Sequence, residues 1–285
     1  MAKSSETAPS LLAVSDLHVS FEQNRPLITD LLVPRSPGDW LIVAGDLGEL
    51  VADIEWVLKL LRSRFAKVIW VPGNHELWTH KRETITLRGV ERYHYLVEFC
   101  RGLGVVTPED PYPVWEGPGG KAVIAPLFLL YDYTFRPEGT STKAESLAVA
   151  YNAGIVATDE VLLAADPYPS IDAWCAARLE LTERRLAELP DDSVTVLVNH
   201  FPLVREPTRV LRYPEFAQWC GTTATASWPT RFRAVAVVYG HLHIPRTTWH
   251  DGIRHEEVSL GYPREWQRRG YQPRIPRQIL PVPPG

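Results

Sequence analysis

The chain has 285 residues, a hydrophobic content of 45% and a formal net charge of -4. This length suffices for one large core, so we expect a single catalytic domain over residues 11–283. A slightly acidic chain does not favour nucleic acid as a partner, so any attraction for phosphate must be local. No stretch approaches the roughly 20 apolar residues of a membrane span, which excludes a membrane-spanning protein.

The cysteines and the first residues bear on the cellular compartment. The three cysteines, Cys100, Cys175 and Cys220, are far apart and lack Cys-x-x-Cys spacing. Residues 1–10 are polar and leave no room for the apolar core of a signal peptide. These features predict free, buried thiols in a cytoplasmic protein.

The first third of the chain alternates between two patterns. Short apolar runs predict strands at about 11–15, 40–45 and 67–72, and helical stretches are expected at about 51–65 and 83–102. In 51–65 the apolar residues recur on one face, as in an amphipathic helix that packs on a sheet. Such alternation indicates an α/β layered fold.

The remaining chain adds further buried strands. Apolar runs predict them at about 122–128, 194–199, 234–239 and 253–260, with a helix near 172–189. So many buried strands predict two mixed β-sheets packed face to face and flanked by helices, a four-layer αββα sandwich.

Three segments depart from this pattern. The stretches 129–171 and 201–227 contain no clear period and follow strand ends, so we interpret them as substrate-shaping loops. The segment 262–277 is locally basic and aromatic. It contains Arg264, Arg268, Arg269, Arg274 and Arg277 with Tyr262, Trp266 and Tyr271.

Five of the apolar runs end in a residue that can bind a metal ion. Strand ends of this kind meet along one rim of a sheet, so we expect these side chains to lie together. Carboxylate, amide oxygen and imidazole are ligands for hard and borderline divalent ions. The candidate ligands are Asp16, His18, Asp46, Asn74, His200, His241 and His243.

Asp46 is the natural bridge between two ions, because Gly45 allows a tight turn and Asp46 lies in the middle of the set. One ion is then expected on Asp16, His18, Asp46 and His243, and the other on Asp46, Asn74, His200 and His241. Because Asn74 adds no charge, the centre stays cationic and attracts phosphate. Two ions that share a bridging carboxylate can activate water and hold the phosphoryl oxygens for in-line attack.

His75 is the candidate general acid. It follows Asn74 in the same loop, where it can protonate a leaving alkoxide without binding metal. Glu49, three residues after Asp46, is the candidate partner that keeps the imidazole oriented and charged.

The five blocks, from Asp16 to His243, resemble those of the calcineurin-like metallophosphoesterases. The resemblance implies a β-sandwich flanked by helices, with the ligand assignment above. It also implies two divalent or mixed-valence ions, with manganese or iron expected ahead of zinc, nickel or magnesium. Glu49 and Leu50 replace the Asp-Arg pair of phosphoprotein phosphatases. Glu49 and His18 replace the Tyr and Asp of purple acid phosphatases, so both branches are disfavoured.

Stretches outside the metal motifs narrow the branch. The segments 65–78, 128–139, 213–223, 240–249 and 262–269 resemble the phosphopantetheinyl hydrolases of actinobacteria, which remove the 4'-phosphopantetheine arm from acyl carrier protein. Aromatic-rich stretches of this kind can equally be ordinary core and loop packing. The residues expected near the substrate are Tyr131, Asp132, Tyr133, Arg136, Trp219, Tyr262 and Arg264.

Three functions remain open at this point. The first is a phosphodiesterase that acts on the phosphopantetheine of an acyl carrier protein. The second is a small-molecule phosphatase or nucleotide phosphodiesterase in a biosynthetic pathway. The third is a non-catalytic, metal-dependent phosphate-binding module, which the complete ligand set disfavours. For the first function, Arg268 and Arg269 are expected to help dock the acidic carrier protein.

Overall fold

The first sheet has four strands in the order β10-β1-β2-β3. The computed structural model describes residues 7–270 and 272–283, so Tyr271 and the first six residues lie outside the described part. Strands β1 (Leu11–Val14), β2 (Trp40–Val43) and β3 (Lys67–Trp70) are parallel, and β10 (Arg277–Leu280) pairs with β1 in the antiparallel sense.

The second sheet has six strands in the order β4-β5-β6-β7-β9-β8. Its four central strands are parallel, and both edge strands are antiparallel to their neighbours. The strands are β4 (Val114–Trp115), β5 (Ala122–Pro126), β6 (Thr195–Val198), β7 (Ala234–Tyr239), β8 (Arg246–His250) and β9 (Ile253–Glu257).

The two sheets face each other across an apolar core. Ile42 and Ile69 of the first sheet pack in one cluster with Ile124, Val196 and Val238 of the second, and all five are fully buried. β-Branched residues suit a strand whose two faces are both covered. This core fixes the relative position of the two sheets and therefore of the turns at their strand ends.

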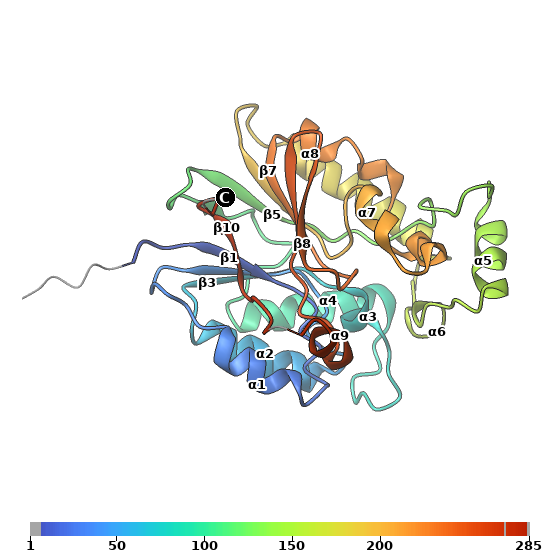
Figure 1. Cartoon of the computed structure of the whole chain (residues 1–285), viewed down its shortest axis with the longest axis horizontal. Helices are drawn as coiled ribbons and strands as arrows, with labels where there is room; N and C mark the ends of the chain where they lie inside the picture. Colours follow the sequence, from blue (N-terminus) through green and yellow to red (C-terminus); the bar gives the residue numbers. More distant parts are fainter. Residues whose placement is uncertain (1–6, 271, 284–285) are drawn as a thin grey trace, which may run out of the picture.

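Helices cover the outer faces of both sheets, as Figure 1 shows. In α2, Ile54, Val57, Leu58 and Leu61 form the buried stripe that the sequence predicts. The predicted four-layer αββα arrangement of two mixed sheets is confirmed. The main covering helices are α1 (Asn24–Leu31), α2 (Val51–Arg62) and α4 (Gly89–Gly102) on the first sheet, and α7 (Ile171–Ala187) and α8 (Trp228–Arg231) on the second.

Several element boundaries differ from the prediction. Helix α4 begins at Gly89 and not near residue 83, because Gly89 has a φ of 57° and a Cβ there would lie 2.4 Å from the Asp166 carbonyl oxygen. Strand β8 was not predicted, since this edge strand is only partly buried and has no apolar run. Strand β10 is another short edge strand, and it carries polar residues at Arg277 and Gln278.

The two segments interpreted as irregular loops contain helical turns. The first holds α5 (Lys143–Asn152) and α6 (Asp159–Leu162), which project to one side of the sandwich in Figure 1. Only Ser146 and Ala150 of α5 are buried, so this helix has no apolar stripe for a sequence pattern to detect. The second holds three short 3₁₀ helices, at Glu206–Val210, Pro214–Trp219 and Thr223–Thr225.

Two remaining expectations concern the thiols and the membrane. Cys100, Cys175 and Cys220 are buried and free. In the described residues no helix is both long enough and apolar enough to cross a membrane. The domain limits at 11 and 283 stay a prediction.

Candidate metal centre

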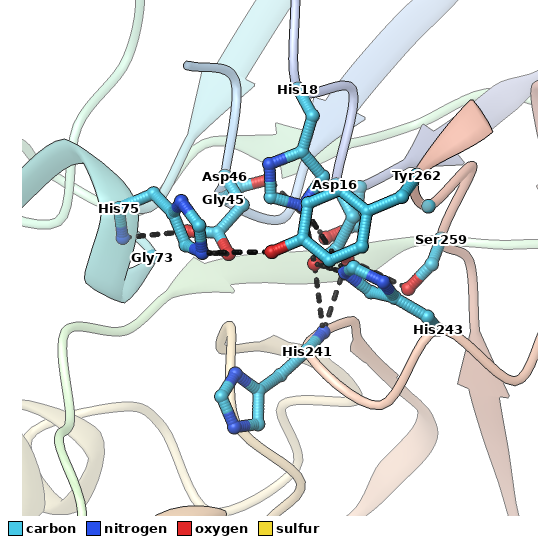
Figure 2. A network of polar contacts seen from close by, with 12 residues as sticks. Asp16, His18, Gly45, Asp46, Gly73, His75, His241, His243, Ser259 and Tyr262 are labelled. Carbon is cyan, nitrogen blue, oxygen red and sulfur yellow. Dashed lines mark hydrogen bonds and ion pairs between the residues drawn. The ribbon is translucent and has the colours of Figure 1, made fainter. Parts of the chain in front are cut away.

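The structure brings all seven candidate ligands together at one rim of the sandwich. Each lies in the segment that follows one of the parallel strands β1, β2, β3, β6 and β7, and Asn74 begins the short helix α3 (Asn74–Leu77) after β3. Asp16, His18, Asp46, Asn74 and His200 are buried, and each exposes 5% or less of its surface. His241 and His243 are partly exposed. In Figure 2 the His243 ring lies beside Asp16 and Tyr262, and the His241 ring is turned away from them, toward the group that it forms with Asp46 and His200.

The backbone of these turns is unusual. Asp16, His18, Asp46, His241 and His243 all have positive φ angles, between 42° and 67°. A non-glycine residue adopts this conformation only when the surrounding structure imposes it, and such residues cluster at functional sites. The strained turns aim the side chains of both sheets at one volume.

Glycines beside the ligands allow neighbouring ligand-bearing segments to approach closely. A Cβ at Gly73 would lie 2.1 Å from Asp46 Oδ1, and one at Gly240 would lie 2.0 Å from Ser15 Oγ. Both distances are far below van der Waals contact, so any side chain with a Cβ would clash and these two positions require glycine.

The first cluster consists of Asp16, His18 and His243. His243 Nε2 lies 3.0 Å from Asp16 Oδ1 and 3.1 Å from His18 Nε2. His18 Nε2 lies 3.8 Å from Asp16 Oδ1. One carboxylate and two imidazoles therefore present ligand atoms to a single point, as one divalent ion requires.

The second cluster contains Asp46, Asn74, His200 and His241. His200 Nε2 lies 3.3 Å from Asp46 Oδ2 and 3.1 Å from Asn74 Oδ1. His241 Nε2 is buried and has no hydrogen-bond partner among the described residues. Because an unpaired buried nitrogen is costly, this atom fits the role of a metal ligand.

Asp46 also belongs to a third group of converging atoms, with His18 and His75. It is thus shared between the two sides of the site, which is the position that a bridging carboxylate needs. The same group places His75 beside His18, a member of the first cluster, although the sequence assigned His75 no ligand role. The donors are carboxylates, an amide and imidazoles, and they fit two divalent first-row ions.

Partners outside the ligand set orient the imidazoles. Glu265 Oε2 lies 2.6 Å from His243 Nδ1, and the carbonyl oxygen of Ala44 lies 2.8 Å from His200 Nδ1. Each contact occupies Nδ1 and leaves Nε2 for an ion, as is typical of metal-binding histidines. Glu265 was not predicted from the sequence, because it follows His243 by 22 residues and belongs to no motif.

Two buried carboxylates support the ligand loops, and sequence reasoning assigned a role to neither. Glu76 accepts hydrogen bonds from the backbone N–H groups of Asp46, Leu47 and Gly73, at 2.8 to 2.9 Å. It thereby ties the Asp46 turn to the turn before Asn74. Its position beside Asn74 was the only signal that could have found it.

Asp159 is the other carboxylate. It accepts hydrogen bonds from Asn74 Nδ2 at 2.9 Å and from Trp78 Nε1 at 2.7 Å. Because the amide nitrogen of Asn74 faces Asp159, the amide oxygen faces the other candidate ligands of the second cluster. Asp159 lies on α6, 85 residues after Asn74, and no sequence pattern connects the two.

His75 lies between the metal cluster and Glu49. Its Nδ1 is 3.6 Å from Glu49 Oε1, an ion-pair distance and not a hydrogen bond. Its Nε2 is 3.3 Å from the Tyr262 hydroxyl, and Figure 2 shows this contact beside the ligands. Burial lowers the pKa of His75, but Asp46, Glu49 and Asp159 offset it, so the pKa lies above its ordinary value.

Two cavities meet at His75. The first, of about 580 Å³, contains Asp46, Asn74, His241 and His243. The second, also of about 580 Å³, extends past Glu49. The residues that line both cavities are His75, Trp78, Thr158, Tyr262 and Arg264.

Only Tyr262 and Arg264 of the seven predicted substrate residues line these cavities. Tyr133 and Trp219 are buried and both bond to Glu160, at 2.8 and 2.7 Å, and Tyr131 is fully buried. The structure thus places these three in the packing of the loops. Asp132 bonds to Thr134 and Thr222, and Arg136 to the Ser141 carbonyl oxygen.

Comparisons with known proteins agree with this geometry. The family model described as calcineurin-like phosphoesterase matches residues 9–245. The [acyl-carrier-protein] phosphodiesterase PptH of Mycobacterium tuberculosis is 58% identical over 275 residues, which is 96% of this chain and 84% of that protein. The crystal structure of phosphopantetheinyl hydrolase (PptH) from M. tuberculosis superimposes with a TM-score of 0.95 at 57% identity. That match covers 98% of this chain and all of the other.

The matched residues include every candidate ligand from Asp16 to His243. They also include strands β1 to β3 of the first sheet and β4 to β7 of the second, whereas β8, β9 and β10 follow the matched segment. The chain therefore belongs to the calcineurin-like phosphoesterase family of metal-dependent hydrolases.

Proposed function

We propose that this protein is a phosphodiesterase that releases 4'-phosphopantetheine from holo-acyl carrier protein. The observation that carries the proposal is the 58% identity with an acyl-carrier-protein phosphodiesterase over 96% of the chain. The family supplies the reaction class, and the relative supplies the substrate. A small-molecule phosphatase or nucleotide phosphodiesterase is the alternative, since the same metal centre supports those reactions.

We propose that two ions occupy the centre, with Asp46 shared between them. Asp16, His18 and His243 would complete one site, and Asn74, His200 and His241 the other. Manganese or iron is expected, ahead of zinc, nickel or magnesium. When bound, such ions supply Lewis acidity to the phosphoryl group and acidify water.

In this proposal His75 assists the leaving group. Hydrolysis breaks the bond between phosphorus and the serine oxygen of the carrier protein, and water supplies the oxygen that phosphorus gains. The serine alkoxide is a poor leaving group, so a proton donor beside it lowers the barrier. His75 Nε2 faces the cavity next to Asp46 and can donate that proton, while Glu49 faces the other ring nitrogen.

The first cavity offers room for the pantetheine arm. Besides candidate ligands it is lined by apolar side chains, among them Leu211, Phe216 and Ile244. A flexible arm with few charges suits such a surface. The three buried free thiols support the expectation that the enzyme works in the cytoplasm.

A substrate panel tests the proposal. The metal-loaded protein is incubated with holo-acyl carrier protein, nucleotide diesters and aryl phosphates, and the products are identified by mass spectrometry. We expect loss of the arm from the carrier protein, with kcat/KM above that for every small substrate. Faster turnover of a nucleotide, with an intact carrier protein, would favour the alternative.

A further inference from the structure

The chemistry of the substrate determines where a carrier protein must bind. This inference rests on the proposed function. The bond that breaks joins phosphorus to a serine oxygen, and only one methylene separates that oxygen from the carrier's backbone. The surface of the carrier protein must therefore contact the opening of the cavity that contains the candidate metal ligands. Side chains at this opening would contact the carrier itself as well as its arm.

Three arginines stand at that opening. Arg212 follows the 3₁₀ helix Glu206–Val210, and Arg264 and Arg268 lie on helix α9 (Pro263–Arg268). All three are exposed and line the cavity that contains Asp46. Within the described part of the chain, none of them makes an ion pair. We call these three residues the arginine rim.

Among the described residues, no carboxylate of the same cavity forms an ion pair with the arginine rim, and Glu265 interacts with Arg264 only beyond ion-pair distance. Asp46 lies against His200, Asp159 accepts hydrogen bonds from Asn74 and Trp78, and Glu265 contacts His243. Each is already engaged inside the site. A chain with a net charge of -4 thus presents a positive surface at the entrance to its cavity.

The structure also changes which arginines of the 262–277 segment can dock a partner. Arg269 donates hydrogen bonds to the carbonyl oxygens of His243, at 2.7 Å, and Leu260, at 3.2 Å. It therefore holds a turn that carries a candidate metal ligand, and the docking role expected for Arg269 from the sequence stays a prediction. Arg277 pairs with Glu256 at 2.8 Å and lines a separate cavity.

We infer that the arginine rim is the docking surface for the carrier protein, which is acidic. Arg212 and Arg268 come from segments more than 50 residues apart, so the fold assembles this surface. Tyr213 and Val156 line the same cavity and are 49% and 59% exposed, and they add an apolar contact. Opposite charges across such an interface raise the association rate and fix the register.

A double charge reversal at Arg212 and Arg268, both to Glu, tests the inference. The readouts are kcat/KM for holo-acyl carrier protein, kcat/KM for bis-p-nitrophenyl phosphate, and the affinity of the apo-carrier protein, which lacks the arm. We expect the ratio of the two kcat/KM values to fall about tenfold or more. Binding of the apo-carrier should weaken in parallel and lose most of its dependence on salt.

The matched control is the reversal of Arg35 and Arg184, which are exposed and line neither cavity. Both double variants change the net charge by the same amount, and the control should keep the wild-type ratio. An unchanged ratio of the two kcat/KM values, whether both fall equally or neither falls, would contradict the role of the arginine rim as a docking surface. The proposed function would still stand. If the wild-type enzyme leaves holo-carrier protein intact, the proposed function fails and the docking surface falls with it.

Discussion

The core between the sheets and the rim that carries the metal ligands are built in opposite ways. Between the sheets, Ile124 and Val196 are fully buried, apolar and regular in conformation. A few residues further along the strands, Asp46, His200 and Asp16 are equally buried but polar or charged. Several residues of the rim also adopt positive φ angles, which are strained for side chains other than glycine.

This contrast separates stability from function along the same strands. Burial of apolar surface between the sheets supplies the favourable free energy of folding. The rim that carries the metal ligands gathers buried carboxylates and imidazoles, and it stays folded because the core imposes its geometry. We therefore expect substitutions of the metal ligands to remove metal and activity, and substitutions in the core to lower stability.

The largest effect is expected for Asp46→Asn. Asp46 is the carboxylate shared by two groups of ligand atoms, so its loss should release both ions. Turnover should fall at least about 10³-fold, about 4 kcal/mol of barrier. Elemental analysis and kinetics check this, and retention of two ions would contradict the bridging role. The metal-free variant should unfold near the temperature of the metal-free wild-type protein, because bound ions stabilise the folded state.

His75→Ala should affect the rate according to the leaving group. A proton donor matters most for a poor leaving group, so alkyl diesters should react about 10²–10⁴-fold more slowly. p-Nitrophenyl esters should lose less, and both ions should stay bound. Loss of one ion would instead indicate that His75 is a ligand, a role that its position beside His18 and Asp46 also allows.

In the core, Ile124→Ala should act on stability alone. Ile124 is fully buried between the sheets on β5, and that strand supplies no candidate ligand. The cavity should cost about 2–5 kcal/mol of unfolding free energy, measured by urea denaturation. Metal content and kcat should remain at wild-type values below the unfolding transition. A loss of metal in the folded variant would contradict the expectation that a core substitution changes stability alone.

A smaller effect is expected for Asp159→Asn. The new amide can turn its nitrogen toward Asn74 and so remove the preference for the orientation in which the Asn74 oxygen faces the metals. Affinity for one of the two ions should fall about 10–100-fold. Competition with a chelator measures this directly. Equal weakening of both ions would indicate a general disturbance of the rim.

The local sequence determined much of this protein. Apolar runs that end in Asp, Asn or His predicted both the strands and the rim, because side chains at the ends of parallel strands must converge. The structure brings all seven candidate ligands together, from Asp16 to His243. Helix α5 and strand β8 escaped prediction, since neither buries a continuous apolar face.

Only the tertiary structure decided which residues support the metal ligands. Asp159 reaches Asn74 across 85 residues, and Glu265 reaches His243 from a helix that follows the last strands of the second sheet. Arg212 joins Arg264 and Arg268 at one cavity, whereas Arg269 turns inward to hold a ligand loop. Contacts of this kind depend on how the loops fold back over the strand ends, and no local periodicity records that path.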